Sequence, residues 1–234
     1  MSNSLRIALI AEGKTDYIII EAALNAILPK PFILTMLPTE NTRSELGEGW
    51  GKVLKWCQEF THINPNVDTR SLATDPTLMD FDLIIIHIDA DVAEKSYADY
   101  GTAVAQATAT LPILPCSQPC PPPSNTVSQL QQLLLAWLGI TQKDAKTVFC
   151  VPSKAGEAWL AAAILPEAHP LLTGIECNLN LETRLSVLPK ALKVRKSVRE
   201  YQSRASTITK NWTTVTALCS QAAIFHQDIE AKQL

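Results

Sequence analysis

The segment that most constrains the fold is residues 82–89, DLIIIHID, where five branched aliphatic side chains surround a single histidine. A short apolar run without polar alternation is typical of a strand that is covered on both faces. Such strands lie in the middle of parallel sheets, which occur in α/β proteins with helices on both faces. We therefore predict a central parallel strand with Asp89 at its carboxyl end.

The segments that precede this strand alternate between strand-like and helix-like patterns. Thr15 is predicted to cap the first helix, and Asp16 falls in its first turn, where the helix dipole favours a negative charge. The order strand, helix, strand, helix is typical of an α/β fold with a mostly parallel sheet flanked by helices. The predicted elements are strands at 5–11 and 32–37 and helices at 17–28 and 50–60.

The second half begins with six prolines in residues 110–124, which predict a loop or extended excursion outside the core. We expect 1–168 to form the α/β domain and 169–234 to form a helical extension packed on it. Ser153 is predicted to cap the helix that precedes this boundary. The further predicted elements are a strand at 145–151 and helices at 126–138, 154–165, 185–203 and 207–231.

Composition excludes several classes of protein. With 47% hydrophobic and 18% charged residues, the 234-residue chain is unlike disordered, collagen-like or coiled-coil proteins. It contains no apolar run of about 18 residues and no signal-peptide pattern, so we predict a cytoplasmic protein with no membrane association. The six scattered cysteines predict reduced thiols; the alternative, a metal site at Cys116 and Cys120, lacks a second pair with zinc-like spacing.

Carboxylates follow three of the predicted strands. Glu12 follows the first, Asp89 and Asp91 follow the central one, and Glu157 follows the last. In an open parallel sheet, ligands bind beyond the carboxyl ends of the strands. Crowded carboxylates repel one another, and Mg²⁺ or Mn²⁺, which prefer oxygen ligands, would relieve that repulsion. Taken singly, each acid has a simpler explanation as a residue at a strand or helix end.

Three motifs in the same order resemble a known family. Glu-Gly-x-Thr-Asp at 12–16 and the Asp-x-Asp of Asp89 and Asp91 resemble the Toprim domain of topoisomerases, bacterial primases and overcoming-lysogenization-defect nucleases. The Glu-x-Trp-Leu element that begins at Glu157 is similar to one in small Toprim-like proteins often placed with bacterial defence systems. The resemblance covers about residues 5–165 and implies a Toprim-like sheet.

This resemblance also implies a chemistry for the acidic residues. Glu12 would act as a general acid/base or metal ligand, while Asp89 and Asp91, with Glu157, would hold Mg²⁺ for phosphoryl transfer. The chain lacks the cysteine array of primases and a convincing context for a topoisomerase tyrosine. A Mg²⁺-dependent nuclease is therefore the favoured hypothesis. The alternatives are a non-catalytic Toprim-like module that binds nucleic acid or a partner protein of a defence system, and a nucleotide-binding α/β protein.

Basic residues are concentrated toward the C-terminus. Residues 184–210 hold eight of the 20 basic residues and one of the 23 acidic ones, although the whole chain has a net charge of −3. Lys190, Lys193, Lys196 and Arg199 are spaced by three and predict a helix face that binds a nucleic-acid backbone; a solvated face is the alternative. Lys14, which borders Glu12, is a candidate phosphate contact.

Two further sequence patterns lie close to these acidic residues. Gly13-Lys14-Thr15 resembles the end of a phosphate-binding P-loop, but Ala8 stands where that motif requires its first glycine, so a P-loop ATPase is excluded. His87 precedes Asp89 by two residues and shares a strand face with it. We predict a packed core residue at His87, because a lone histidine in an aliphatic strand is more often packed than a ligand.

Overall fold

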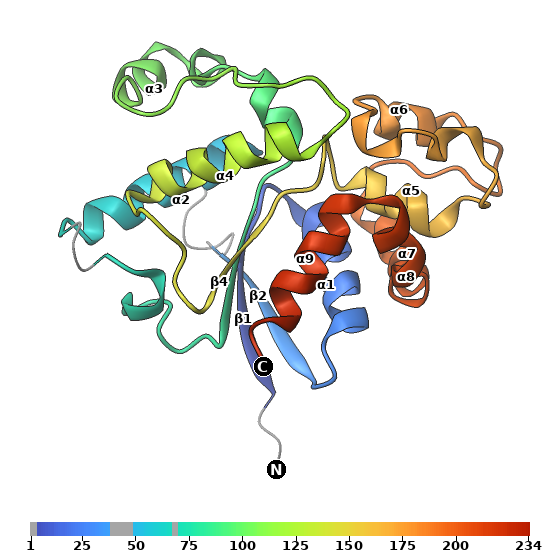
Figure 1. Cartoon of the computed structure of the whole chain (residues 1–234), viewed down its shortest axis with the longest axis horizontal. Coiled ribbons are helices and arrows are strands. Elements are labelled where there is room, and N and C mark those ends of the chain that lie inside the picture. The colour runs from blue at the N-terminus through green and yellow to red at the C-terminus, as the bar shows by residue number, and fades with distance from the viewer. Residues whose placement is uncertain (1–3, 38–48, 67–69) are drawn as a thin grey trace.

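A computed structural model describes residues 4–37, 49–66 and 70–234 of the chain. Its centre is a four-stranded, all-parallel sheet with the strand order β2-β1-β3-β4 (Figure 1). The strand predicted to be central has a neighbour on each side, so the sequence-based prediction of a parallel α/β sheet is confirmed. The strands are β1 (Leu5–Ile10), β2 (Phe32–Leu37), β3 (Leu83–His87) and β4 (Thr147–Cys150).

Side-chain alternation along the strands divides the interior into two hydrophobic cores. Leu83 and Ile85 of β3 belong to one core, whereas Ile84 and Ile86 belong to the other. All five residues of β3 are buried, as expected for a strand covered on both faces. The sheet is therefore the middle layer of three.

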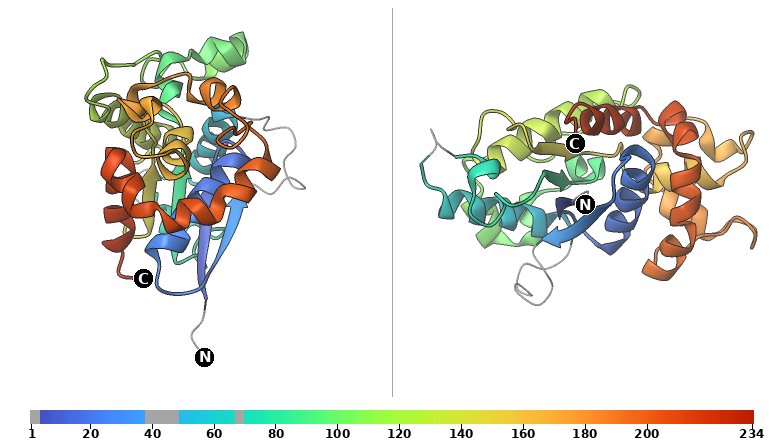
Figure 2. Two further views of the ribbon diagram at one scale, coloured as in Figure 1. Left: turned by 90° about the vertical axis from the view of Figure 1, so that its right-hand side faces the viewer. Right: turned by 90° about the horizontal axis from the view of Figure 1, so that it is seen from below.

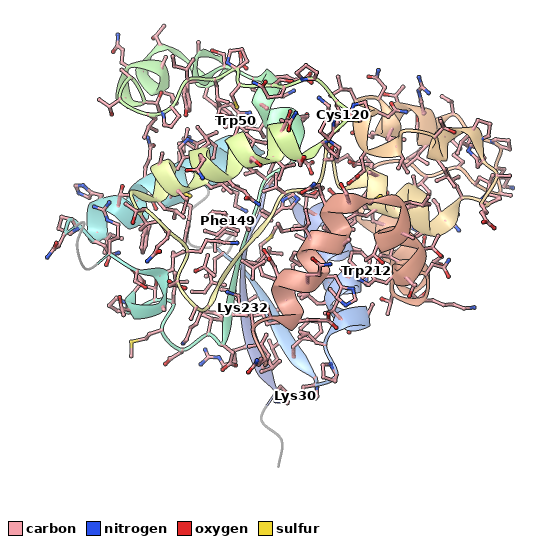
Figure 3. All side chains as sticks on the ribbon, in the orientation of Figure 1. Lys30, Trp50, Cys120, Phe149, Trp212 and Lys232 are labelled. Atoms are coloured by element: carbon pink, nitrogen blue, oxygen red, sulfur yellow. A yellow bond between two sulfur atoms is a disulfide. The ribbon has the colours of Figure 1, made fainter. Side chains whose placement is uncertain are left out.

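Helices cover both faces of the sheet (Figures 1 and 2). On one face, α2 (Trp50–Ile63) and α4 (Ser124–Leu138) pack against each other and on the sheet. On the other face, α1 (Lys14–Ile27) and α5 (Glu157–Ile164) pack with the C-terminal helices. Trp50 and Trp212 therefore lie on opposite sides of the sheet (Figure 3).

The C-terminal region is helical, as predicted, and shares the second core. Ile208, Trp212 and Phe225 are buried in the same cluster as Ile7 and Leu9 of β1. Helix α9 lies beside β4 and α1, so the C-terminal helices complete the covering of this face (Figure 2). The helices are α6 (Leu181–Ser186), α7 (Val198–Lys210), α8 (Trp212–Leu218) and α9 (Ser220–Glu230).

Two predicted helices in this region are wrong in extent. Residues 185–203 do not form one helix, because α6 ends at Ser186 and α7 begins only at Val198. Pro189 interrupts the segment, since proline cannot donate a helical hydrogen bond and clashes with the preceding turn. The helix expected at 207–231 is instead the end of α7 followed by α8 and α9.

Both predicted helix caps are also wrong. Gly13, rather than Thr15, occupies the N-cap position of α1, and no side chain caps it. Ser153 does not cap α5, which begins later, at Glu157. Instead the Ser153 hydroxyl donates to the carbonyl of Glu176 at 2.5 Å. Lys154, with φ of +62°, has a left-handed backbone that a helix cannot contain.

The proline-rich excursion at 110–124 has no helix or strand before Ser124, as predicted, but its Leu114 is buried in one of the two cores, so the prediction that the whole excursion lies outside the core is wrong. Its Cys120 forms a disulfide with Cys177, which corrects the prediction that all six cysteines are reduced and removes Cys120 as a metal ligand. The pairing joins residues 57 apart in sequence, so their separation along the chain gave no indication of it. None of the described helices is long and apolar enough to span a membrane.

The remaining elements are short and connect the layers. They are α3 (Thr102–Ala107) and 3₁₀ helices at Leu72–Thr74, Ala90–Glu94, Tyr97–Tyr100, Pro170–Leu172 and Ile175–Cys177.

Candidate active site at the carboxyl edge of the sheet

Glu12 and Asp89 meet at the carboxyl edge of the sheet. Glu12 lies two residues beyond β1 and Asp89 two residues beyond β3, which are neighbouring parallel strands. The backbone N–H of Asp89 donates a hydrogen bond of 2.8 Å to Oε1 of Glu12. The structure thus brings together two of the residues that the sequence placed in one site.

Asp89 is held by the loop between β4 and α5. The backbone N–H of Gly156 donates to Oδ1 of Asp89 at 3.0 Å. The next two backbone N–H groups, of Ala90 and Asp91, donate to the carbonyls of Pro152 and Lys154 at 3.0 Å and 2.9 Å. Asp89 is buried, and its Oδ1 accepts a hydrogen bond from the backbone, so the carboxylate has a fixed orientation.

His87 belongs to this site, although its place in an aliphatic strand suggested only a packed residue. It is buried, and its Nε2 lies 3.5 Å from Oδ1 of Asp89. Burial favours the neutral imidazole, but the hydrogen bond to Asp89 and the charges of Asp16 and Asp89 raise the pKa of His87 to about 9. The imidazolium therefore lies beside the carboxylate of Asp89 and interacts electrostatically with Glu12.

Asp16 is a site residue that the sequence argument assigned only to the helix dipole. It is buried in the first turn of α1, four residues after Glu12. Burial and the charge of Asp89 raise the pKa of Asp16 to about 7, against the opposing charge of His87. Burial and Asp89 likewise raise the pKa of Glu12 well above its usual value. Three carboxyl groups, of Glu12, Asp16 and Asp89, therefore interact electrostatically with one another and with His87.

Glu157 is buried but has protein partners of its own. Its Oε1 accepts a hydrogen bond of 2.6 Å from the Tyr201 hydroxyl and lies 3.1 Å from Nζ of Lys196. Lys196 also pairs with Glu182 at 3.4 Å. Burial opposes the charged form of Lys196, but the charge of Glu157 raises the pKa of this lysine. The structure thus ties Glu157 to the C-terminal region.

Tyr201 gives a test of this buried cluster. Replacing it with phenylalanine removes the hydroxyl that bonds Glu157, so we expect the free energy of unfolding to fall by about 1–3 kcal/mol. The matched control is Tyr17→Phe, because Tyr17 donates to the carboxylate of Glu21 at a partly exposed position. Urea unfolding measures both variants, and equal losses would contradict the structural role given to Tyr201.

Asp91 lies at the rim of the site. Its carboxylate is 3.4 Å from Nζ of Lys95, and its side chain is 38% exposed. Burial and the charge of Asp89 raise the pKa of Asp91, while Lys95 lowers it. Asp91 therefore lies within electrostatic range of Asp89 but is more accessible and already partly neutralised.

The predicted basic residues separate into three groups. Lys14 is exposed at the start of α1. Lys190, Lys193 and Arg199 line a cleft of about 500 Å³ together with Arg195 and Arg204, which the sequence argument did not single out. Lys196 is absent from that cleft and pairs with Glu157 and Glu182 instead. The even spacing of these residues therefore did not place them on one face.

The acidic residues fit the donor chemistry of a hard divalent cation. Mg²⁺ is often held by one or two carboxylates and several waters rather than by a protein cage. The second carboxylate oxygens of Glu12 and Asp89 accept no hydrogen bond from the described residues. Across the same residues, no three His, Cys, Asp or Glu side chains are grouped to hold a metal ion. Any Mg²⁺ site here would therefore use few protein ligands.

The fold and this site define an α/β protein in which a partly buried glutamate and a buried aspartate, with a histidine beside the aspartate, lie at the carboxyl edge of a parallel sheet. No family model matches the chain, and no curated protein or solved structure is significantly similar to it. The Toprim resemblance therefore stays a prediction from the three motifs.

Proposed function

We propose that the protein is a Mg²⁺-dependent phosphoryl-transfer enzyme, and specifically a nuclease that cleaves phosphodiester bonds. The observation that carries this proposal is the contact between Glu12 and Asp89 at the carboxyl edge of the sheet. Ligands of open parallel sheets bind at this edge. Burial and the neighbouring carboxylate of Asp89 raise the pKa values of Glu12 and Asp16, and a divalent cation would offset that cost of holding them charged.

Each residue has a distinct part in the proposed reaction. Asp89, fixed by the Gly156 N–H, would hold the ion, with Asp91 at the rim. A bound Mg²⁺ would neutralise charge on the phosphoryl group. Oε2 of Glu12, the oxygen not bonded to the backbone, would take the proton from the water that attacks phosphorus, while the P–O bond to the leaving oxygen breaks and that oxygen takes a proton from solvent. His87, whose Nε2 lies 3.5 Å from Oδ1 of Asp89, would hold this carboxylate in its orientation.

The test is cleavage of single- and double-stranded DNA and RNA by the purified protein with Mg²⁺ or Mn²⁺. We expect Glu12→Gln to lower the rate by about 100-fold or more, because the amide cannot accept the proton. The control is Glu230→Gln, which removes an exposed carboxylate that pairs only with His226 at the end of α9. Unchanged cleavage in Glu12→Gln would show that the activity belongs to another site or to a contaminant.

A second candidate function is a nucleic-acid-binding module without catalysis. The observation in its favour is that five basic residues form a cleft, while no group of three metal-binding side chains exists among the described residues. Binding of nucleic acid with no cleavage under any metal condition would support this module. For both functions we propose nucleic acid as the partner and the cytoplasm as the location.

A further inference from the structure

The cleft beside α7 carries a dense positive charge. Its volume is about 500 Å³, and five of its lining residues are basic: Lys190, Lys193, Arg195, Arg199 and Arg204. Glu200 is its one acidic residue, and Ser203 adds a hydroxyl. No salt bridge joins any of the five basic groups to a carboxylate in the described part of the chain, whereas the nearby Lys196 has two.

The cleft is built from a loop and a helix that are both anchored. Between Lys193 and Arg195, the buried Val194 fixes the loop, and its N–H donates to the carbonyl of Leu185 at 3.1 Å. On α7, Tyr201 points inward to Glu157, so residues two positions away on either side, Arg199 and Ser203, point outward. Arg199 and Ser203 therefore lie on the side of α7 away from Glu157, and the loop that carries Lys193 and Arg195 is held in place by Val194.

Arg204 provides an independent indication of a ligand. Its Nε is buried and finds no hydrogen-bond partner among the described residues. A buried donor without a partner is costly, and arginine presents a planar set of donors that matches phosphate oxygens. A phosphate oxygen in the cleft would satisfy this donor.

We infer that this cleft binds a phosphate group of a nucleic-acid strand, with the partly buried Arg204 supplying its Nε donor and Lys193, Arg195 and Arg199 around it. A volume of 500 Å³ has room for a whole nucleotide, since pockets of about 300–1,000 Å³ hold small ligands. A free nucleotide carries the same phosphate chemistry. The choice of a strand rests on the proposed function, because the acidic site alone would repel a polyanion and needs a positive surface nearby.

The test measures binding without metal, so that it does not depend on catalysis. Fluorescence anisotropy in EDTA would follow a labelled single-stranded oligonucleotide binding to the wild type and to the triple variant Arg195→Gln, Arg199→Gln, Arg204→Gln. We expect affinity to fall by about tenfold or more, and the slope of log affinity against log salt to become shallower by about 2. The control is Arg184→Gln, which removes an exposed arginine of α6 outside the cleft.

A second variant separates binding from folding. Arg204→Lys keeps the charge but loses the planar donors, so we expect weaker binding with an unchanged melting temperature. A nucleoside monophosphate, tested as a competitor, distinguishes the two sources of phosphate. If it displaces the labelled oligonucleotide and binds as tightly as the oligonucleotide does, the cleft is a site for free nucleotides. Wild-type affinity and salt slope in the triple variant would overturn the inference. Metal-free binding without any cleavage would support the cleft while refuting the proposed enzyme.

Discussion

Replacement of Asp89 by asparagine is expected to lower Mg²⁺-dependent cleavage by more than about 100-fold, whereas Asp91→Asn should lower it by less than about tenfold. Asp89 is buried, is oriented by the Gly156 N–H and contacts Glu12 through its own backbone. Asp91 is 38% exposed and pairs with Lys95. The two aspartates are two residues apart, so each variant serves as the matched control for the other.

The same pair of variants has a readout that does not require activity. A cation that binds the folded state raises its stability, so Mg²⁺ should raise the melting temperature of the wild type and of Asp91→Asn. It should not raise that of Asp89→Asn, because the asparagine amide lacks the charge that the ion compensates. Differential scanning fluorimetry with and without EDTA measures the shift. Equal responses in the two variants would remove Asp89 from its central place in the proposed site.

Trp159→Ala should produce the largest loss of stability, about 3–5 kcal/mol in the free energy of unfolding. The indole is fully buried; it packs edge-on against Trp212 at a centroid distance of 5.4 Å and lies tilted against Phe225 at 5.7 Å. These contacts join α5 to α8 and α9. Removing the indole therefore leaves a cavity between the central domain and the C-terminal helices.

Two comparison variants define what Trp159 contributes. Its Nε1 is buried without a hydrogen-bond partner, so Trp159→Phe should cost much less than Trp159→Ala, since phenylalanine fills part of the space and leaves no unpaired donor. Trp56→Ala is the control, because Trp56 is only partly buried where it stacks on Phe60. Urea unfolding would report all three, and a loss in Trp159→Ala no greater than in Trp56→Ala would contradict this packing.

The strands were predictable because runs of apolar side chains indicate buried strands. The aliphatic run of β3 has no polar alternation, and the structure covers it on both faces. The helix at 50–60 followed from apolar spacing, and Gly139, with φ of +58°, ends α4 as a left-handed cap. These features depend on local patterns, which the sequence contains.

Elements that depend on distant partners were not predictable. Ser153 looked like a cap, but its hydroxyl donates to Glu176, a residue brought near only by the fold. The break in the basic segment is an exception. Pro189 lies within the helical spacing and was a local indication that the helix would end. The same break placed Lys196 against Glu157 and left its basic neighbours in the cleft.

The candidate site shows the same division. Because the carboxyl ends of parallel strands lie at one edge of a sheet, the sequence predicted that Glu12 and Asp89 would lie close together. In the structure they are in contact. It did not reveal Asp16 as a member, although its spacing of four from Glu12 places it at the same edge. Nor did it show that Glu157 is occupied by Tyr201, because that partner follows it by 44 residues.

The placement of α9 beside β4 and α1 has a consequence for the order in which the chain can fold during synthesis. Ribosomes deliver the N-terminal strands first. Helices α1 and α5 can cover part of this face first, but Ile7, Leu9 and Val148 lack their final neighbours until α7, α8 and α9 have also emerged. The hydrophobic core on this face is therefore completed later in synthesis than the sheet itself.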